Sequence, residues 1–115
     1  MHRDLKPENI LVECDEATNE VIHVKITDFG LSKIIVPGEI MFESCGTPAY
    51  VAPEVLYKKG YSKEVDIWSA GIILYTMMAR ALPFHSNDRK KTFRLIKTAE
   101  PEFTAEIWNN VSEDC

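Results

Sequence analysis

The stretch His2-Arg3-Asp4-Leu5-Lys6-Pro7-Glu8-Asn9 decides how the rest of this chain is interpreted. Acidic, basic and amide side chains alternate within it, and the apolar run Ile10-Leu11-Val12 follows at once. The ends of protein chains are ordinarily polar and loosely ordered. A dense set of different polar groups that leads straight into a strand-like run is instead typical of the middle of a folded domain.

The length and composition indicate one small globular domain. The chain has 115 residues, of which 45% are hydrophobic and 27% charged, an ordinary globular balance. A chain of this length buries only a modest core. The net charge of −5 argues against nucleic acid or an anionic membrane surface as the main partner. We therefore interpret the basic clusters Lys58-Lys59 and Arg89-Lys90-Lys91 as solvated surface.

The cysteine pattern favours a reducing compartment. The three cysteines, Cys14, Cys45 and Cys115, are odd in number and show no C-x-x-C spacing. Such a pattern predicts neither a disulfide framework nor a zinc site. The sequence shows no signal peptide, and its longest apolar stretch is well short of the ~20 residues that span a bilayer. We expect a cytoplasmic location.

The first half of the chain predicts a hairpin followed by a long ordered loop. Residues 10–13 and 21–27 are short, β-branched runs separated by a polar, turn-forming stretch, which is the pattern of two paired strands. From residue 28 to about residue 53 the sequence has no periodicity and is interrupted by glycine and proline. Loops this long in a compact domain are usually functional or disordered.

The second half predicts two helices. Ser62 is placed to cap a helix from about Lys63 to Ala79, and because this helix is apolar on every side we expect it to be buried in the core. Asn87 or Asp88 caps a more polar helix that ends near Thr98. On this second helix we expect Phe93 and Ile96 to share an inner face. Near the end of the chain, Trp108 is expected to anchor a short turn, and a helix is expected to start at 112–114. The expected core includes Trp68, Tyr75, Met77 and Met78. The fold class is α+β and predominantly helical.

Three motifs carry the chemistry, and their order matters more than any one of them. The first is the 2–9 stretch, the second is Asp28-Phe29-Gly30 directly after a predicted strand, and the third is Gly46-Thr47-Pro48 leading into Ala52-Pro53-Glu54. Each motif alone is weak, because such triplets occur by chance in many unrelated chains. Together, in this order and on these elements, they resemble the C-terminal lobe of a eukaryotic protein kinase, whose catalytic loop, D-F-G and A-P-E signatures they match.

The resemblance implies a partial kinase C-lobe over residues 1–115, with no second domain. Its expected parts are a catalytic loop, a short β-hairpin, an activation loop, a buried central helix and one further helix. The sequence contains no G-x-G-x-x-G loop and no strand lysine of the V-A-I-K type. Those parts belong to the N-lobe, which we expect to precede this chain. On its own the chain would then hold half an ATP site, and we expect it to be inactive.

The same resemblance implies roles for five residues. Asp4 would accept the proton of a substrate hydroxyl, and Asn9 and Asp28 would hold the Mg²⁺ ions that bridge the phosphates of ATP. Lys6 resembles the lysine that contacts the transferred phosphate in serine/threonine kinases, and Thr47 resembles the threonine that lines their acceptor site. Taken singly, Asp4 also fits a loop cap, Asn9 a turn residue and Asp28 a solvated acid at a strand end.

Within the family, the chain is most similar to the calcium/calmodulin-dependent group, including calcium-dependent protein kinases and the phosphorylase kinase catalytic subunit. Glu43 occupies a position where many relatives are phosphorylated. Its carboxylate could pair with Arg3 and order the activation loop without a phosphate, or it could simply face water. The expected partners are protein substrates with Ser or Thr, and calmodulin or calcium-sensing regions outside this chain are candidates. Nucleic acid and membranes are not expected.

Three more residues have implied structural roles. Asp66 resembles the acid that accepts backbone N–H groups of the catalytic loop and so positions Arg3 and Asp4. His2 would pack inward beneath that loop, and Glu54 resembles an acid whose arginine partner lies beyond this chain.

Two other functions stay open. One is a non-catalytic kinase fragment that acts as a binding or regulatory module, or has no function. The other is a small-molecule phosphotransferase, which the long loop ending at Ala52-Pro53-Glu54 disfavours, because in protein kinases this loop forms the peptide-docking platform.

Overall fold

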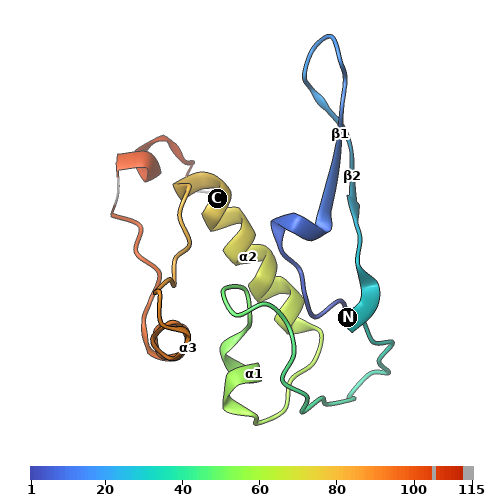
Figure 1. The fold of residues 1–115 in the computed structure, drawn as a ribbon, viewed down its shortest axis with the longest axis vertical. Coiled ribbons are helices and arrows are strands. Elements are labelled where there is room, and N and C mark those ends of the chain that lie inside the picture. Colours follow the sequence, from blue (N-terminus) through green and yellow to red (C-terminus); the bar gives the residue numbers. More distant parts are fainter. Residues whose placement is uncertain (105, 113–115) are drawn as a thin grey trace.

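The computed structural model describes residues 1–104 and 106–112. A short 3₁₀ turn, Pro7–Asn9, leads into strands β1 (Ile10–Cys14) and β2 (Val21–Ile26), and a second 3₁₀ turn follows at Phe29–Leu31. The helices are α1 (Pro53–Tyr57), α2 (Glu64–Ala79) and α3 (Arg89–Thr98), and a 3₁₀ turn at Glu106–Asn110 comes last. Figure 1 shows the hairpin projecting from one side of the molecule, with α2 running diagonally through its middle.

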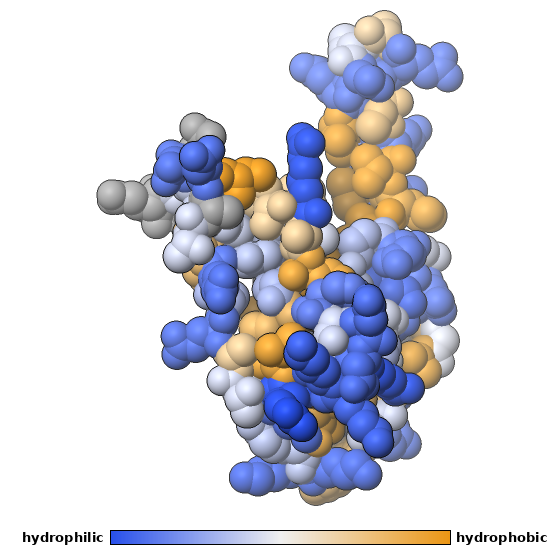
Figure 2. All heavy atoms as spheres, turned by 60° about the vertical axis from the view of Figure 1, so that its left-hand side comes forward, coloured by the Kyte–Doolittle hydropathy of each residue, from blue (hydrophilic) through white to orange (hydrophobic). Residues whose placement is uncertain are grey.

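The predicted hairpin is present. β1 and β2 pair antiparallel, with Ile10 opposite Ile26 and Val12 opposite Val24. The turn is closed by the carboxylate of Asp15, which accepts the backbone N–H groups of Ala17 and Thr18 at 2.8 Å each. Apart from Ile10, which is half-buried, the hairpin's apolar side chains are exposed, and they form part of the orange surface of the projection in Figure 2. Within the described residues, packing against a core therefore does not hold this hairpin.

The start of α2 differs from the prediction. Lys63, not Ser62, is the N-cap residue, and no side chain caps the helix. Ser62 contributes only its backbone carbonyl, which accepts the N–H of Val65 at 3.3 Å. The position of the helix is nevertheless close to that predicted, because the long apolar run fixes its extent and a cap adds only a local stabilisation.

The expectation that α2 is buried on every side is wrong for this chain. Val65, Ile72 and Ile73 are buried, whereas Ile67 is 75% exposed and Met77 is 71% exposed. The core assignment of Met77 is therefore also wrong. The reason is that the described elements pack against only part of the helix surface. The apolar pattern shows only that every side of the helix is suited to burial. The described residues pack against some of these sides and leave the others exposed to solvent.

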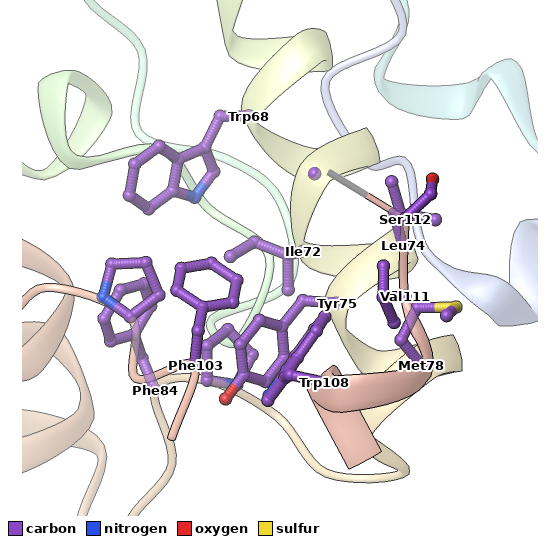
Figure 3. Close-up of a pocket in the computed structure, with 13 residues that line it drawn as sticks. Trp68, Ile72, Leu74, Tyr75, Met78, Phe84, Phe103, Trp108, Val111 and Ser112 are labelled. Carbon is purple, nitrogen blue, oxygen red and sulfur yellow. The ribbon is translucent and has the colours of Figure 1, made fainter. Parts of the chain in front are cut away.

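One side of α2 is lined by aromatic side chains. A cavity of about 520 Å³ lies between α2 and the C-terminal segment, and Trp68, Ile72 and Tyr75 face it from the helix (Figure 3). Trp108 packs against Tyr75 and Phe103 with ring centroids 5.0 and 4.9 Å away, which agrees with its predicted role in a short turn. The helix start expected at 112–114 lies mostly outside the described residues.

The core joins the long loop to the helices. Its buried apolar side chains are Met41, Val51, Ala52, Val55, Tyr61, Val65, Ile72, Phe84 and Ile96. The backbones of Met41 and Tyr61 exchange hydrogen bonds of 2.8 and 2.9 Å, which ties the loop to the segment before α2. The sequence did not predict α1, because its proline suggested a loop, although proline is well tolerated in the first turn of a helix.

The second predicted helix is present as α3, with Asp88 as its cap. The Asp88 carboxylate accepts the N–H of Lys90 at 2.8 Å. Ile96 is buried and Phe93 packs against the same core, as expected. In the described part of the chain, no helix is long and apolar enough to cross a membrane.

Candidate functional site

The 2–9 loop is held by one carboxylate on the first turn of α2. The backbone N–H of His2 donates to Oδ2 of Asp66 at 2.7 Å, and the N–H of Arg3 donates to Oδ1 at 2.8 Å. Hydrogen bonds to an ionised acceptor are among the stronger ones in proteins. Because both carboxylate oxygens are used, the loop is fixed in orientation as well as in position.

The side chain of His2 also stabilises this loop through hydrogen bonds to Thr27 and Asp4. Its side chain is buried, with Nε2 3.0 Å from the carbonyl oxygen of Thr27 and Nδ1 3.2 Å from the N–H of Asp4. A carbonyl oxygen only accepts hydrogen bonds, so Nε2 carries the proton and Nδ1 accepts from Asp4. The ring also packs edge-on against Phe29, at 5.0 Å between centroids. One neutral imidazole thus connects the start of the chain to the Asp28-Phe29-Gly30 segment.

Arg3 connects the loop to the long segment that follows the hairpin. Its Nε donates to the carbonyl oxygen of Leu31 at 2.6 Å, and its Nη1 donates to Oε2 of Glu43 at 2.7 Å. This hydrogen bond raises the pKa of Arg3 and lowers the pKa of Glu43. Of the two alternatives for Glu43, the structure has the one in which its carboxylate meets Arg3, although the side chain is largely exposed.

Asp4, Lys6 and Thr47 form a closed polar cluster. Oδ1 of Asp4 accepts the N–H and the hydroxyl of Thr47, at 2.8 and 2.7 Å. Nζ of Lys6 lies 3.0 Å from Oδ2 of Asp4 and donates to Oγ1 of Thr47 at 3.0 Å. Burial raises the pKa of Asp4, but the hydrogen bonds from Thr47 and Lys6 together outweigh burial and leave it below the ordinary value. The bond to Asp4 in turn raises the pKa of Lys6.

Asn9 and Asp28 lie at the two ends of the hairpin. The carbonyl oxygen of Asn9 accepts the N–H of Thr27 at 2.9 Å, which brings the two ends together. The Asn9 side chain is buried, and its Nδ2 donates to the Asp4 carbonyl at 3.0 Å, so the amide oxygen is not used in that bond. Asp28 is exposed and has left-handed backbone geometry, φ 60°. Its Oδ1 accepts the N–H of Gly30 at 3.3 Å.

The donor types of this pair suit magnesium. An amide oxygen and a carboxylate are hard ligands, and Mg²⁺ is usually held by one or two protein groups together with waters and phosphate oxygens. Within the described residues, no group of three or more His, Cys, Asp and Glu side chains is arranged to hold a metal ion. Asn9 and Asp28 could therefore serve only as two of several ligands around such an ion.

Glu54 and Tyr61 lie outside the cluster of Asp4, Lys6 and Thr47. Glu54 lies in the first turn of α1. Among the described residues, its carboxylate forms no hydrogen bond or ion pair with Asp4, Lys6 or Thr47. Tyr61 was not predicted: it is buried, and its hydroxyl donates to the Glu43 carbonyl at 2.6 Å and lies 3.5 Å from Nη1 of Arg3. A single tyrosine in a polar stretch carries no periodic signal, so the sequence offered no way to find it.

We expect Gly46→Ala to destabilise the fold more than Gly38→Ala. Both glycines have positive φ, 101° and 86°, so both substitutions carry the left-handed backbone penalty of about 1 kcal/mol. A Cβ at Gly46 would also lie 2.7 Å from the carbonyl oxygen of Arg3, whereas one at Gly38 would meet nothing within 4 Å. Thermal unfolding of the two variants measures the difference, and equal midpoints would contradict the close approach of these two loops.

We expect the segment around Glu43 to loosen in acid. Since the Arg3 hydrogen bond lowers the pKa of Glu43, the stabilisation is complete above the ordinary pKa of a glutamate and is lost as pH falls through the lowered, folded-state value. Protection factors from hydrogen exchange, which correct for the intrinsic effect of pH, should fall for residues 43–46 over this range. Asp4 titrates in acid as well, so Glu43→Gln is the control: it should show low protection at neutral pH and a weaker pH dependence.

Comparison with known proteins gives a family and several relatives for this chain. The family described as the protein kinase domain matches residues 1–115. The chain is 45% identical over 115 residues to serine/threonine-protein kinase DCLK3 of Mus musculus, covering 98% of this chain and 14% of that protein. It is 46% identical over 114 residues to myosin light chain kinase A of Dictyostelium discoideum, covering 99% of this chain and 38% of that protein.

Human DCLK3 gives the same result, with 45% identity over 115 residues and coverage of 98% of this chain and 17% of that protein. The chain thus spans well under half the length of each of these relatives. The match nevertheless extends from the first residue to the last, and it includes the loop held by Asp66, the hairpin and all three helices of the described residues. The chain belongs to the protein kinase domain family.

Proposed function

We propose that this chain is the C-lobe portion of a serine/threonine protein kinase and supplies the catalytic loop for phosphoryl transfer to protein hydroxyls. The observation that carries the proposal is the cluster of Asp4, Lys6 and Thr47, which places a carboxylate, an ammonium and a hydroxyl within 3.0 Å of one another. Phosphoryl transfer needs little covalent chemistry from a protein. Catalysis is mostly positioning and the neutralisation of charge.

Asp4 is the residue that would receive the substrate hydroxyl. Its pKa is held low by Thr47 and Lys6, so it stays ionised at neutral pH and acts by orienting the hydroxyl and accepting its proton as the bond to phosphorus forms. Lys6 is close enough to Asp4 to place a positive charge beside the reacting group. A group with a low pKa is a weak base. The contribution of Asp4 to catalysis would therefore come more from how it positions the substrate hydroxyl than from its strength as a base.

Asn9 and Asp28 are the residues that would hold Mg²⁺, and Lys6 would contact the phosphates of ATP. When bound, magnesium and ATP supply the phosphoryl group and the cations that neutralise its charge. The amide of Asn9 is oriented by its bond to the Asp4 carbonyl, which couples the predicted metal ligand to the backbone of the predicted base. The exposed carboxylate of Asp28 is accessible to a ligand from solvent.

A protein substrate fits this chain better than a small alcohol. Residues 28–53 form a long segment tied to the loop by Arg3–Glu43 and Asp4–Thr47, and it provides an extended surface beside Asp4 on which a polypeptide can lie. The relatives' names include a myosin light chain kinase, which is consistent with a protein substrate. The reducing, ATP-rich cytoplasm is the compartment we propose for this activity.

Glu43 supports a further part of the proposal, that the activation segment does not need phosphorylation. The carboxylate forms with Arg3 the kind of charge pair that a phosphate would otherwise provide. Membership of the calcium/calmodulin-dependent group rests on the sequence likeness described above. Regulation by calmodulin or by calcium-sensing regions outside the chain stays a prediction.

The test is Asp4→Asn in the full-length protein, assayed for phosphate transfer from ATP to a serine- or threonine-containing protein. We expect kcat to fall by about 10²-fold or more, the usual effect of losing a positioned proton acceptor. Glu16→Gln, which removes an exposed acid in the hairpin turn, should leave kcat unchanged.

Three outcomes would contradict the proposal. Equal activity of the Asp4→Asn variant and the unmodified protein would remove Asp4 from the chemistry. Phosphorylation of small alcohols but of no protein would favour the small-molecule alternative. No transfer by the unmodified full-length protein, together with binding of a kinase or a regulator, would favour a non-catalytic binding module.

A further inference from the structure

Ser44 places an exposed hydroxyl on the long segment that follows the hairpin. The other hydroxyl nearby, that of Thr47, donates to Oδ1 of Asp4 and is only partly exposed. Between residues 43 and 48, the Ser44 hydroxyl is therefore the one open to a modifying enzyme. The carboxylate of the adjacent Glu43 already pairs with Arg3, so a group attached to Ser44 would need a different partner.

Such a partner exists on α3 and at the end of α1. Ser44 lines a pocket of about 300 Å³ between the long segment, α1 and α3. Three basic side chains line the same pocket, and we call them the cation cluster: Lys58, Arg89 and Lys97. None of the residues that line the pocket is acidic. A negative group on Ser44 would therefore enter a small space that is bordered by three positive side chains and by no negative one.

Aromatic rings position two members of the cation cluster. The guanidinium of Arg89 lies 5.1 Å from the centre of the Phe93 ring, and Nζ of Lys97 lies 5.2 Å from the centre of the Tyr57 ring. The Tyr57 hydroxyl donates to the Lys97 carbonyl at 2.9 Å, which joins α1 to α3. Over residues 1–104 and 106–112, no carboxylate forms an ion pair with a member of the cluster. The charges of the cluster are therefore available to a new group.

A phosphate is the modification that suits the cation cluster. Phosphoserine carries roughly −1.5 to −2 charges at neutral pH. A guanidinium binds phosphate through two parallel N–H···O bonds, and the ammonium group of a lysine is a further donor. α3 has the sequence RKKTFRLIKT, in which half of the residues are basic and none is acidic, although the chain as a whole carries a net charge of −5. The positive charge beside Ser44 is therefore local and is not a property of the whole surface.

We propose that Ser44 is a phosphorylation site, that its phosphate is bound by the cation cluster, and that this modification lowers the activity toward protein substrates. A protein kinase would transfer the γ-phosphoryl group of ATP. The Ser44 oxygen forms a bond to phosphorus, the bond to ADP breaks, and the hydroxyl proton passes to a base of the transferring enzyme. Binding of the phosphate does not depend on the proposed function, whereas the effect on activity rests on it.

The expected loss of activity follows from the place of Ser44 in the segment. Thr47 donates to Asp4, and a Cβ at Gly46 would lie 2.7 Å from the Arg3 carbonyl oxygen, so residues 46 and 47 lie against the 2–9 loop. A polypeptide that presents a hydroxyl at Asp4 must therefore pass close to Ser44. A bound phosphate adds bulk and negative charge at this point, and it holds the segment to α3.

The experiment installs phosphoserine at position 44 of the full-length protein by genetic incorporation and follows the phosphorus signal by NMR without ATP. The second pKa of phosphoserine is ordinarily about 6. Because nearby cations favour the doubly charged phosphate, the titration midpoint in the folded protein should lie about one pH unit lower. The reference is a phosphorylated peptide of residues 39–49, which keeps Glu43 beside the phosphate but contains no lysine or arginine.

Substitutions in the cation cluster separate its effect from that of the rest of the protein. Arg89→Gln with Lys97→Gln should return the midpoint most of the way to the value of the peptide, whereas Lys25→Gln, which changes an exposed lysine on β2, should leave the midpoint lowered. If the double variant does not fold, Arg89→Gln alone replaces it and should recover part of the difference. A midpoint equal to that of the peptide before any substitution, or equal effects of Lys25→Gln and the cluster variants, would overturn the proposal.

Two further measurements test the modification itself and its effect. Mass spectrometry of the protein, isolated with phosphatase inhibitors from the cells that make it, should detect phosphate on Ser44, and recovery of this peptide only in the unmodified form would overturn the assignment. In the kinase assay, phosphorylation of Ser44 should lower kcat/KM for a protein substrate by about tenfold or more. The loss should be smaller in the Arg89→Gln, Lys97→Gln background, and an unchanged kcat/KM would overturn the inhibitory effect.

The NMR result is separate from the test of the proposed function, because it needs no catalysis. A lowered midpoint in a full-length protein that transfers no phosphate would refute the proposed enzyme and leave the phosphate-binding site in place. An active enzyme whose midpoint equals that of the peptide would refute only the phosphate-binding site.

Discussion

The carboxylate of Asp66 is the contact on which the rest of the site depends. It sits in the first turn of α2, where negative charge is favourable, and accepts the N–H groups of His2 and Arg3, 64 and 63 residues away in the sequence. The backbone at Arg3 is left-handed, φ 72°, a conformation that an arginine keeps only when its surroundings impose it. With the backbone of Arg3 held there, its side chain reaches Leu31 and Glu43, and the next residue is Asp4.

Polar contacts, together with the burial of Met41, Val51 and Ala52, order the long segment after the hairpin. Arg3 meets Glu43, Asp4 meets Thr47, and the backbones of Met41 and Tyr61 pair with each other. Each contact joins a catalytic-loop residue or a core residue to a different point of the segment. The segment therefore lies beside Asp4, which accepts the N–H and the hydroxyl of Thr47.

The sequence predicted the parts of the fold that rest on local patterns. β-branched runs indicated the hairpin, and Asn87 or Asp88 was expected to cap the helix that is α3, for which Asp88 is the cap. It failed for α2, because an apolar pattern states which faces could be buried and not whether neighbours are present to bury them; Met77 is exposed for this reason. For the candidate site, the motifs identified the polar groups, but Tyr61, whose hydroxyl bonds the Glu43 carbonyl, required the structure, since a contact between distant residues leaves no mark in either stretch of sequence.

The most direct test of the central claim is NMR-detected hydrogen exchange of the His2 and Arg3 amides in the full-length protein and in its Asp66→Asn variant. An asparagine can accept only one of the two N–H groups with its oxygen, and its own NH₂ faces the other. We predict that the amide that faces the asparagine NH₂ loses about tenfold or more of its protection, while Glu64→Gln, an exposed acid in the same turn, leaves both amides unchanged. Unchanged protection in Asp66→Asn would contradict the account, because the loop would then be held without this carboxylate.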